Sequence, residues 1–511
     1  MSRRVVDIDL NRVEGDLQFQ LELDGNTVAD ARCIGTLYRG FEQIMIGRQP
    51  KDSLVVTPRI CGICGTAHLY SAVLALEQIG AIPVPPNATR IRNLCLMAET
   101  VQSDLRQSFL FFTADFCHSR YAKHPLYSQA VEAFQPFQGW AHRGTLEHSR
   151  HMVKIVALFG GQWPHSSYML PGGVTTPPTA RRIVDCQALL RPLTRWFENQ
   201  VIGGDLDRWL ALASAEDLFR WLEDEKPAAG AVGLMTLLAR SLGLHRQAPG
   251  TPHMLSYGVG CDPEHWQPPY TENRHLWRSG FLDGERGEVE GFDHRQIAEH
   301  VRYSWFLPYA GGRHPWQGQT VPDYQPHSDR YTWSKAPRYR DQVVQTGPLA
   351  ELLIDGEPLI TALYREEGGS TWLRQFARLR RTGLFLARMR DTLRELAAGL
   401  GQAHYLPPPD ARLPDGEGYG LVAAARGALG HWVRVADGVI SQYQVVTPTA
   451  WNASPKDTAG RHGHWEQSLL GIEVQNPDDP LEIGHIIRSH DPCLVCTVHV
   501  LGKDRRLSLR P

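Results

Sequence analysis

Hydrophobic and polar residues alternate near the start of the chain. Leu17, Phe19, Leu21 and Leu23 are separated by polar residues, so all four would lie on one face of a strand. The run ends at Asp24-Gly25, a typical hairpin turn. This pattern predicts a small antiparallel sheet at the N-terminus.

Two later segments have the spacing of long helices. The first begins at Asn87, a predicted N-cap after two prolines, and repeats apolar residues every three or four positions up to Phe112. The second runs from Trp372 to Leu396 and ends near Gly399 and Gly401. Arginines occupy the other positions of the second helix, and we interpret them as a solvated face rather than a binding patch.

The rest of the pattern indicates one large unit. Residues 250–345 are rich in Pro, Gly, Trp, Tyr and His without periodicity, which is typical of loops and short strands over a core. We find neither an internal repeat nor a flexible linker. The predicted fold class is α+β and predominantly helical, with a central helix bundle and small peripheral β-sheets.

Composition excludes several classes of protein. Lys and Arg total 53 against 55 Asp and Glu, so a net charge of −2 does not favour nucleic acid as a partner. No apolar stretch reaches the length of a membrane span, and the N-terminus lacks the apolar region of a signal peptide. We therefore expect a soluble chain without a transmembrane segment or a signal of its own.

Four of the nine cysteines form two Cys-x-x-Cys pairs, Cys61/Cys64 and Cys493/Cys496. Four thiolates suit zinc, nickel, iron or an iron–sulfur cluster. In a zinc ribbon the two pairs usually lie about 15–20 residues apart. Here nearly the whole chain separates the two pairs, so a simple zinc site would have to close a very long loop at a high entropic cost. The spacing alone still allows a zinc site.

Seven motifs together resemble the large, catalytic subunit of NiFe-hydrogenases. They occur in the order of that family between residues 12 and 499, as RVEG, RGFE, RICGICGTAH, FGGQWPHS, AARGALGHW, QVVTPTAWN and DPCLVCTVH. The resemblance implies the hydrogenase large-subunit fold over residues 1–499. It also implies a nickel–iron centre whose iron carries carbonyl and cyanide ligands.

The resemblance assigns the cysteines to that centre. Cys61 and Cys493 correspond to terminal nickel ligands, and Cys64 and Cys496 to ligands that bridge nickel and iron. Soft thiolates suit nickel, and an open position on it can bind H2. The reaction implied is the heterolytic oxidation of H2 to protons and electrons.

Three further residues match groups around the metals. Glu14 corresponds to a carboxylate beside a terminal cysteine and is the expected proton gate. Arg426 corresponds to an arginine above the open side of the metals, although its pattern alone indicates a surface residue. Thr449 corresponds to a hydroxyl that donates a hydrogen bond to a cyanide.

The resemblance also implies a magnesium site. Its protein ligands correspond to Glu42, His499 and the carbonyl of Val445, and oxygen ligands are those that Mg²⁺ prefers. Three other motif residues are expected to support these groups rather than to bind metal, namely His68, His165 and Asp491.

The sequence departs from the family pattern at three positions. Ala425 stands where many members have proline, and either Ser103 stands where an aspartate often points at the metals or a shift of one residue gives that place to Asp104. His490 replaces an apolar aromatic residue, and we expect it to be packed and neutral. The first two departures favour the cytosolic uptake and sensor-like branch.

The remaining cysteines are too scattered to bind an iron–sulfur cluster, so electrons must leave through another chain. The resemblance implies that this chain forms an obligate heterodimer with a small subunit that carries iron–sulfur clusters, and that two such heterodimers associate. It also predicts that residues 500–511 are a C-terminal extension removed by an endopeptidase after His499. The expected location is the cytoplasm, either free or peripheral at the inner face of the membrane.

Three hypotheses remain at this stage. An H2-oxidising uptake enzyme is favoured by the C-terminal extension, which sensor-type large subunits generally lack. An H2 sensor that signals through a kinase is the second. The third is a structural protein with a four-cysteine zinc site, or a relative of the quinone-binding subunit of respiratory complex I, whose pattern lacks the four cysteines.

Overall fold

The structure is a computed structural model that describes residues 4–9, 17–265, 274–410, 412–492 and 507–508. Four of the predicted site residues lie outside these ranges, namely Glu14, Cys493, Cys496 and His499. Their roles stay predictions.

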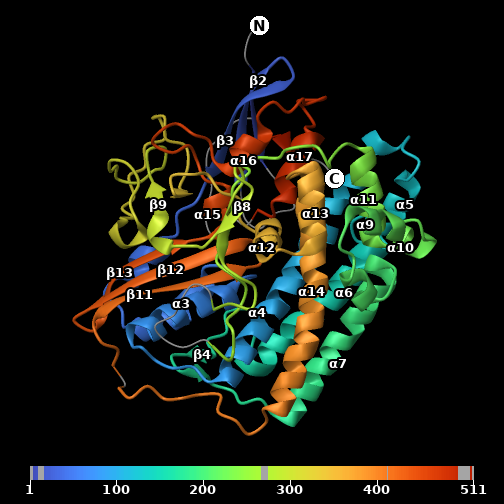
Figure 1. Ribbon diagram of the computed structural model, residues 1–511. Helices are drawn as coiled ribbons and strands as arrows, with labels where there is room; N and C mark the ends of the chain where they lie inside the picture. Colours follow the sequence, from blue (N-terminus) through green and yellow to red (C-terminus); the bar gives the residue numbers. More distant parts are fainter. Residues whose placement is uncertain (1–3, 10–16, 266–273, 411, 493–506, 509–511) are drawn as a thin grey trace.

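Long helices packed side by side form the centre of the molecule (Figure 1). They are α3 (Gly65–Ile79), α4 (Pro86–Arg106), α6 (Trp140–Gly160), α7 (Ala180–Trp196) and α14 (Thr371–Ala398). Both predicted long helices are confirmed as α4 and α14. Their apolar residues are buried in one continuous core because every face of α4 is covered by other elements.

The predicted end of α14 agrees with the structure, whereas the predicted start of α4 does not. Ser370 caps α14 by accepting a hydrogen bond from the backbone N–H of Leu373, and Gly399 follows its last residue. The prediction of Asn87 as the N-cap of α4 is wrong. The helix begins at Pro86, and the Asn87 side chain instead donates to the carbonyl of Gly399, at 2.8 Å.

The interpretation of the α14 arginines as a solvated face is wrong for the first four of them, whereas the side chains of Arg390 and Arg394 near the end of the helix are 42% and 68% exposed. Arg374, Arg378, Arg380 and Arg381 are only 1–3% exposed. Three of them pair with buried carboxylates on neighbouring elements, which are Asp104, Glu351 and Glu357. Arginine is tolerated at these positions because its charge is paired and hydrogen-bonded.

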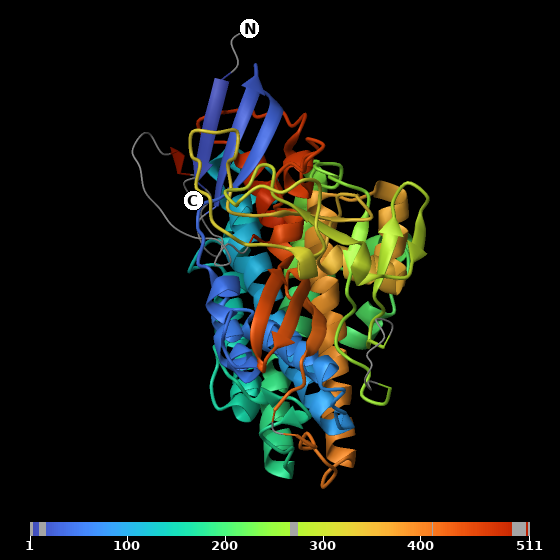
Figure 2. The same cartoon turned by 90° about the vertical axis from the view of Figure 1, so that its left-hand side faces the viewer.

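A three-stranded antiparallel sheet, β11 (Gly416–Ala424), β12 (Gly427–Ala436) and β13 (Val439–Val446), packs against α3 (Figure 2). Glycines allow the close approach, since a Cβ atom on Gly418 would lie 2.2 Å from the Ala75 carbonyl oxygen and one on Gly420 only 1.8 Å from that of Ser71. Strand β11 therefore runs along α3 from its C-terminal toward its N-terminal end. The turn that joins β11 to β12 lies beyond Ser71 in that direction.

The predicted N-terminal sheet is confirmed. Strands β1 (Arg4–Asp9), β2 (Leu17–Asp24) and β3 (Thr27–Gly35) are antiparallel, and β14 (Leu507–Ser508) pairs parallel to β1. Phe19, Leu21 and Leu23 face a second core formed with α16 (His464–Leu469) and α17 (Leu481–Ser489). This sheet therefore lies over the helix that leads to the C-terminal cysteine motif.

Among its described residues, the segment 250–345 contains short strands and loops, as predicted, together with the 3-10 helices His294–Gln296 and Pro315–Gln317. The short strands of the molecule are β4 (Met169–Leu170), β5 (Gly173–Val174), β6 (Met254–Ser256), β7 (Gly280–Asp283), β8 (Glu288–Glu290), β9 (Ile297–His300) and β10 (Ala336–Tyr339). The remaining α-helices are α1 (Phe41–Met45), α2 (Ser53–Val56), α5 (Tyr127–Phe134), α8 (Leu206–Leu210), α9 (Ala215–Trp221), α10 (Glu225–Ala229), α11 (Ala231–Ser241), α12 (Pro348–Asp355), α13 (Pro358–Glu367) and α15 (Pro448–Asn452).

Across the described part of the chain, none of the helices combines the length and apolar character needed to span a membrane.

Candidate metal centre and its surroundings

The first cysteine pair lies in the loop that enters α3. Cys64 immediately precedes the helix, which starts at Gly65. Cys61 and Cys64 are buried, their Cα atoms lie 5.5 Å apart, and the structure pairs their sulfur atoms as a disulfide. The two sulfurs thus converge at a helix N-terminus, a position that favours thiolates when the pair is reduced.

Close backbone packing fixes this loop. A Cβ atom on Gly65 would lie 2.9 Å from the carbonyl oxygen of Pro58, so glycine is needed there. The Nδ1 atom of His165 lies 2.9 Å from the same carbonyl. His165 therefore supports the cysteine loop, in agreement with the role expected for it.

A buried carboxylate that the sequence analysis missed caps the same helix. Glu99 on α4 accepts hydrogen bonds from the backbone N–H groups of Thr66 and Ala67, at 3.1 and 3.3 Å, and from the indole of Trp163, at 3.0 Å. Burial raises the pKa of Glu99, and these donors act in the opposite direction. The signal in the sequence was an acidic residue within the otherwise apolar run Leu94–Val101 of a buried helix.

Two histidines and a tyrosine form a buried hydrogen-bonded row beside the first turn of α3. His68 Nδ1 lies 3.0 Å from His431 Nε2, and His431 Nδ1 lies 2.8 Å from the Tyr443 hydroxyl. Burial lowers the pKa of His68 to about 3 and that of His431 well below its ordinary value. His68 is therefore neutral and structural at physiological pH.

Arg426 lies in the turn between β11 and β12 and is buried, although its sequence pattern indicated the surface. Its Nε atom lies 3.1 Å from a carboxylate oxygen of Asp491 and donates to the Asp491 carbonyl at 3.2 Å. Because β11 runs toward the N-terminus of α3, this turn lies at the same end of the helix as the cysteine loop. Asp491 stands two residues before Cys493, so the second cysteine motif starts at this end too.

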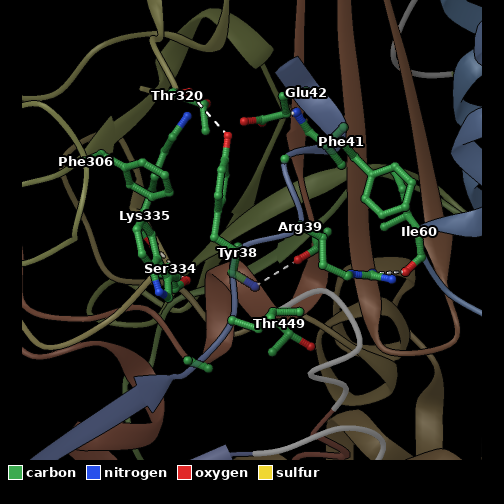
Figure 3. A pocket seen from close by; sticks show the side chains of 18 of the residues that line it. Tyr38, Arg39, Phe41, Glu42, Ile60, Phe306, Thr320, Ser334, Lys335 and Thr449 are labelled. Carbon is green, nitrogen blue, oxygen red and sulfur yellow. Dashed lines mark hydrogen bonds between the residues drawn. The ribbon is translucent and has the colours of Figure 1, made fainter. Parts of the chain in front are cut away.

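A cavity of about 120 Å³ brings together three of the other predicted residues, Glu42, Val445 and Thr449 (Figure 3). Ile60, which precedes Cys61, also lines it. Glu42 accepts a hydrogen bond from the backbone N–H of Val445, at 2.8 Å. Figure 3 shows Thr449 and Glu42 on opposite sides of the cavity, with Tyr38 between them.

Comparison with known proteins gives the family. The sequence matches the family described as nickel-dependent hydrogenase over residues 39–135 and 244–499. The chain belongs to this family. Among curated relatives, it is 29% identical to the large subunit of the periplasmic [NiFeSe] hydrogenase of Desulfomicrobium baculatum, over 96% of this chain and 94% of the relative. It is 29% identical to the hydrogenase-2 large chain of Escherichia coli K12 (99% and 98% covered) and 28% identical to the uptake hydrogenase large subunit of Rubrivivax gelatinosus (99% and 96% covered).

Solved hydrogenases have the same fold. The Ni-Fe-Se hydrogenase of D. vulgaris Hildenborough in the reduced state superposes with a TM-score of 0.79 at 28% identity, covering 98% of this chain and 100% of the other. The reduced, active Ni-Fe-Se hydrogenase of Desulfomicrobium baculatum gives a TM-score of 0.80 at 28% identity, with the same coverage. The prediction of a hydrogenase large-subunit fold is therefore confirmed, and the protein is a nickel-dependent hydrogenase.

The described residues of this hydrogenase include two of the four thiolate ligands predicted for the nickel–iron centre. Cys61 and Cys64 supply two converging sulfur atoms, and the chain that leads to Cys493 is fixed at the same end of α3. Among the described residues, no group of three or more His, Cys, Asp and Glu side chains is arranged to bind a metal. The other two predicted cysteine ligands lie outside the described residues.

The cavity of the hydrogenase has a second charged cluster that the sequence analysis missed. Lys335 donates to the side-chain oxygen of Gln444 at 2.6 Å and lies 3.5 Å from Glu299. Burial raises the pKa of Glu299 to about 7; Lys335 lowers it and Glu42 raises it. Glu42 and Glu299 thus place carboxylate oxygens around one cavity, which fits a hard cation such as Mg²⁺.

Proposed function

We propose that this chain is the catalytic large subunit of an uptake hydrogenase, which oxidises H2 to two protons and two electrons. The observation that carries the proposal is the convergence of three features at the N-terminus of α3. These are the buried pair Cys61/Cys64, the buried Arg426, and Asp491, which leads to Cys493. Four thiolates from two distant segments would complete a site there.

Each cysteine would have one role in holding the metals. Cys61 and Cys493 would be terminal nickel ligands, and Cys64 and Cys496 would bridge nickel and iron. When bound, the centre supplies an open nickel position for H2 and an iron that carries carbonyl and cyanide. The packing of Gly65 and His165 on the Pro58 carbonyl would hold the loop that carries two of the sulfurs.

The surrounding residues would orient ligands and move protons. Asp491 fixes the Arg426 guanidinium, whose fork of donors would orient the cyanides and polarise H2. Thr449 lines the cavity beside Ile60, and its hydroxyl would donate to a cyanide. Glu14 would accept the proton from a terminal cysteine thiol.

Magnesium would bind at the other side of the cavity. Glu42, the Val445 carbonyl and His499 are the proposed protein ligands. His499 would then be the last residue of the mature chain, because an endopeptidase would remove residues 500–511 after metal insertion. The intact mass of the active subunit tests this step, and a full-length chain in active enzyme would contradict it.

Electrons would leave through an iron–sulfur small subunit. Within the described residues, the cysteines outside the Cys61/Cys64 pair are Cys33, Cys95, Cys117, Cys186 and Cys261, and no group of them is arranged to bind a metal cluster. The relatives named above are large subunits or large chains of hydrogenases. We propose the same obligate heterodimer here, paired again into a dimer of heterodimers.

The compartment is a separate proposal. The departures at Ala425 and Ser103 favour the cytosolic uptake and sensor-like branch, whereas one relative is named as periplasmic. We propose a cytoplasmic location, either free or at the inner face of the membrane. Cell fractionation with antibodies against this chain tests it, and recovery in the periplasm would overturn it.

An H2 sensor is the second candidate, because the departures at Ala425 and Ser103 favour the cytosolic uptake and sensor-like branch. A sensor would turn over too slowly for respiration and would change a kinase complex in response to H2. Fast turnover without such a complex would exclude it.

H2-dependent dye reduction by the purified heterodimer, with metal analysis, tests the main proposal. We expect nickel and iron in the large subunit and turnover that requires H2. Nickel-loaded protein without dye reduction or H2/D2 exchange would contradict the proposal. Zinc without nickel would instead support a structural four-cysteine site.

A further inference from the structure

Three arginines and three carboxylates form a continuous row of buried ion pairs around α14. Figure 1 shows α4, α12 and α17 gathered around this helix. Along the row, the members are Glu351 (α12), Arg381 (α14), Asp104 (α4), Arg378 (α14), Asp491 (after α17) and Arg426 (β11–β12 turn). The charges balance, and each side chain is at most 5% exposed.

The row ends on Asp491, which stands two residues before Cys493, and on Arg426. Arg378 bridges two carboxylates, since its Nη1 atom lies 3.2 Å from Asp104 and 3.0 Å from Asp491. Asp491 is held from the other side by Arg426, at 3.1 Å. Asp491 has a left-handed backbone conformation, with φ of 58°, immediately before Pro492. Its two arginine partners thus hold a turn of the chain that a non-glycine residue seldom adopts.

A second contact fixes the backbone of Arg426. Arg381 donates a hydrogen bond to the carbonyl of Ala425, the residue directly before Arg426. The same guanidinium binds Asp104 and Glu351, at 2.6 and 2.7 Å. A proline at position 425 would restrict the backbone by itself, and alanine does not. Arg381 therefore supplies a restraint that this sequence lacks locally.

Two of the three departures from the family pattern, Ala425 and Ser103, thus adjoin the row. Ala425 provides the carbonyl that Arg381 binds, and Ser103 adjoins Asp104, which pairs with both arginines. We propose that Arg378 and Arg381 are positioning residues that set the orientation of Arg426 and of Asp491, the residue that opens the second cysteine motif. This inference rests on the proposed function.

The same helix offers a matched control. Arg380 is as buried as Arg381 and pairs with Glu357 at 2.7 Å. It also donates to the carbonyls of Trp209, Leu210 and Leu212, at the end of α8 and in the loop after it, and lies over the Trp209 ring. Arg380 thus has the same chemistry and burial, but the contacts that it makes do not include the Asp491 and Arg426 pair.

The test compares Arg378→Met with Arg380→Met in the purified heterodimer. Arg378→Met leaves Asp104 paired with Arg381 and Asp491 paired with Arg426, so we expect it to fold. At equal nickel content, we expect its kcat to fall about 10- to 100-fold with KM changed less than about threefold. The infrared bands of iron-bound cyanide should shift as well, because the donors around them move.

The control decides between positioning and general packing. Arg380→Met should lower the melting temperature at least as much as Arg378→Met, because it leaves Glu357 without its cation, yet keep the wild-type infrared bands and kcat. Equal band shifts in both variants, or wild-type bands and kcat in Arg378→Met, would overturn the inference. Arg378→Lys, which keeps the charge but reaches one carboxylate more easily than two, should give an intermediate shift.

The wild-type measurement separates this inference from the proposed function. If the wild-type protein lacks nickel and diatomic bands, the proposed function fails. If it has both and Arg378→Met matches it in every readout, only the positioning role fails.

Discussion

The two halves of the cysteine site are held in place in different ways. In the Cys61/Cys64 loop the groups that are held belong to the backbone, since Gly65 packs on the Pro58 carbonyl and the first N–H groups of α3 donate to the Glu99 side chain on α4. The chain that leads to Cys493 is held by charged and amide side chains from other elements. Arg378 and Arg426 bind Asp491, and Gln375 donates to the last carbonyls of α17.

The two halves therefore differ in how many elements must pack together to hold them. The contacts of the first half with Glu99 need only α3 and α4 to pack together. The second half needs α4, α14, α17 and the β11–β12 turn to meet before its charges are paired, and an unpaired buried charge is costly. We therefore expect a substitution in the first half to affect mainly metal binding and activity, and a substitution in the second half to affect stability as well.

Cys61→Ser should have the largest effect on activity. The variant loses one soft ligand while the fold keeps its other contacts, so we expect nickel and H2 oxidation to fall below about 1% of the wild type. Cys261→Ser changes a buried cysteine elsewhere and should retain both. Nickel per chain and dye reduction are the measurements, and a nickel-loaded, active Cys61→Ser enzyme would remove Cys61 from the ligand set.

Asp104→Asn should have the largest effect on stability. It removes the shared partner of Arg378 and Arg381, and breaking a buried charge network typically costs about 3–5 kcal/mol. Asp341→Asn breaks an exposed pair with Arg461 and should cost less than about 1 kcal/mol. Urea unfolding followed by tryptophan fluorescence compares the two, and equal midpoints would show that the row does not stabilise the second half.

Glu99→Gln should change how stability depends on pH. The pKa of Glu99 is raised from 4.5, so the folded protein keeps a proton that the unfolded chain has lost, and stability falls as the pH rises above about 4.5 through the folded pKa. Glutamine cannot titrate, so this part of the slope should disappear. Melting temperatures across that range, compared with Glu132→Gln on the partly exposed helix α5, measure it. Parallel curves for wild type and Glu99→Gln would contradict the raised pKa.

His490→Phe should have the smallest effect. Burial lowers the pKa of His490 well below 6.5, with Arg374, His464 and Arg378 acting in the same direction. The unfolded chain therefore binds a proton below about pH 6.5 that the folded state does not, and stability is lost as the pH falls. The variant should match wild type at pH 8 and be relatively more stable at pH 5.5. A relative loss of stability at pH 5.5 would show that the imidazole is charged in the fold.

The sequence predicted the first half of the site better than the second for a physical reason. The cysteine loop, the N-terminal sheet and the two long helices depend on residues close together along the chain, where spacing carries the signal. Arg381 and Asp104 are 277 residues apart, and Arg378 and Asp491 are 113 apart. No periodicity shows that such charges meet, so the α14 arginines were interpreted as solvated and Glu99 was missed. Motif resemblance found Arg426 and Asp491 but not what holds them.

The infrared spectrum of the purified heterodimer tests the central claim most directly. If Cys61, Cys64, Cys493 and Cys496 hold a nickel–iron centre, bands from iron-bound carbonyl and cyanide should be present, should change under H2, and should be absent from Cys61→Ser. A metal-loaded wild-type protein without these bands, or with bands that H2 does not change, would contradict the claim.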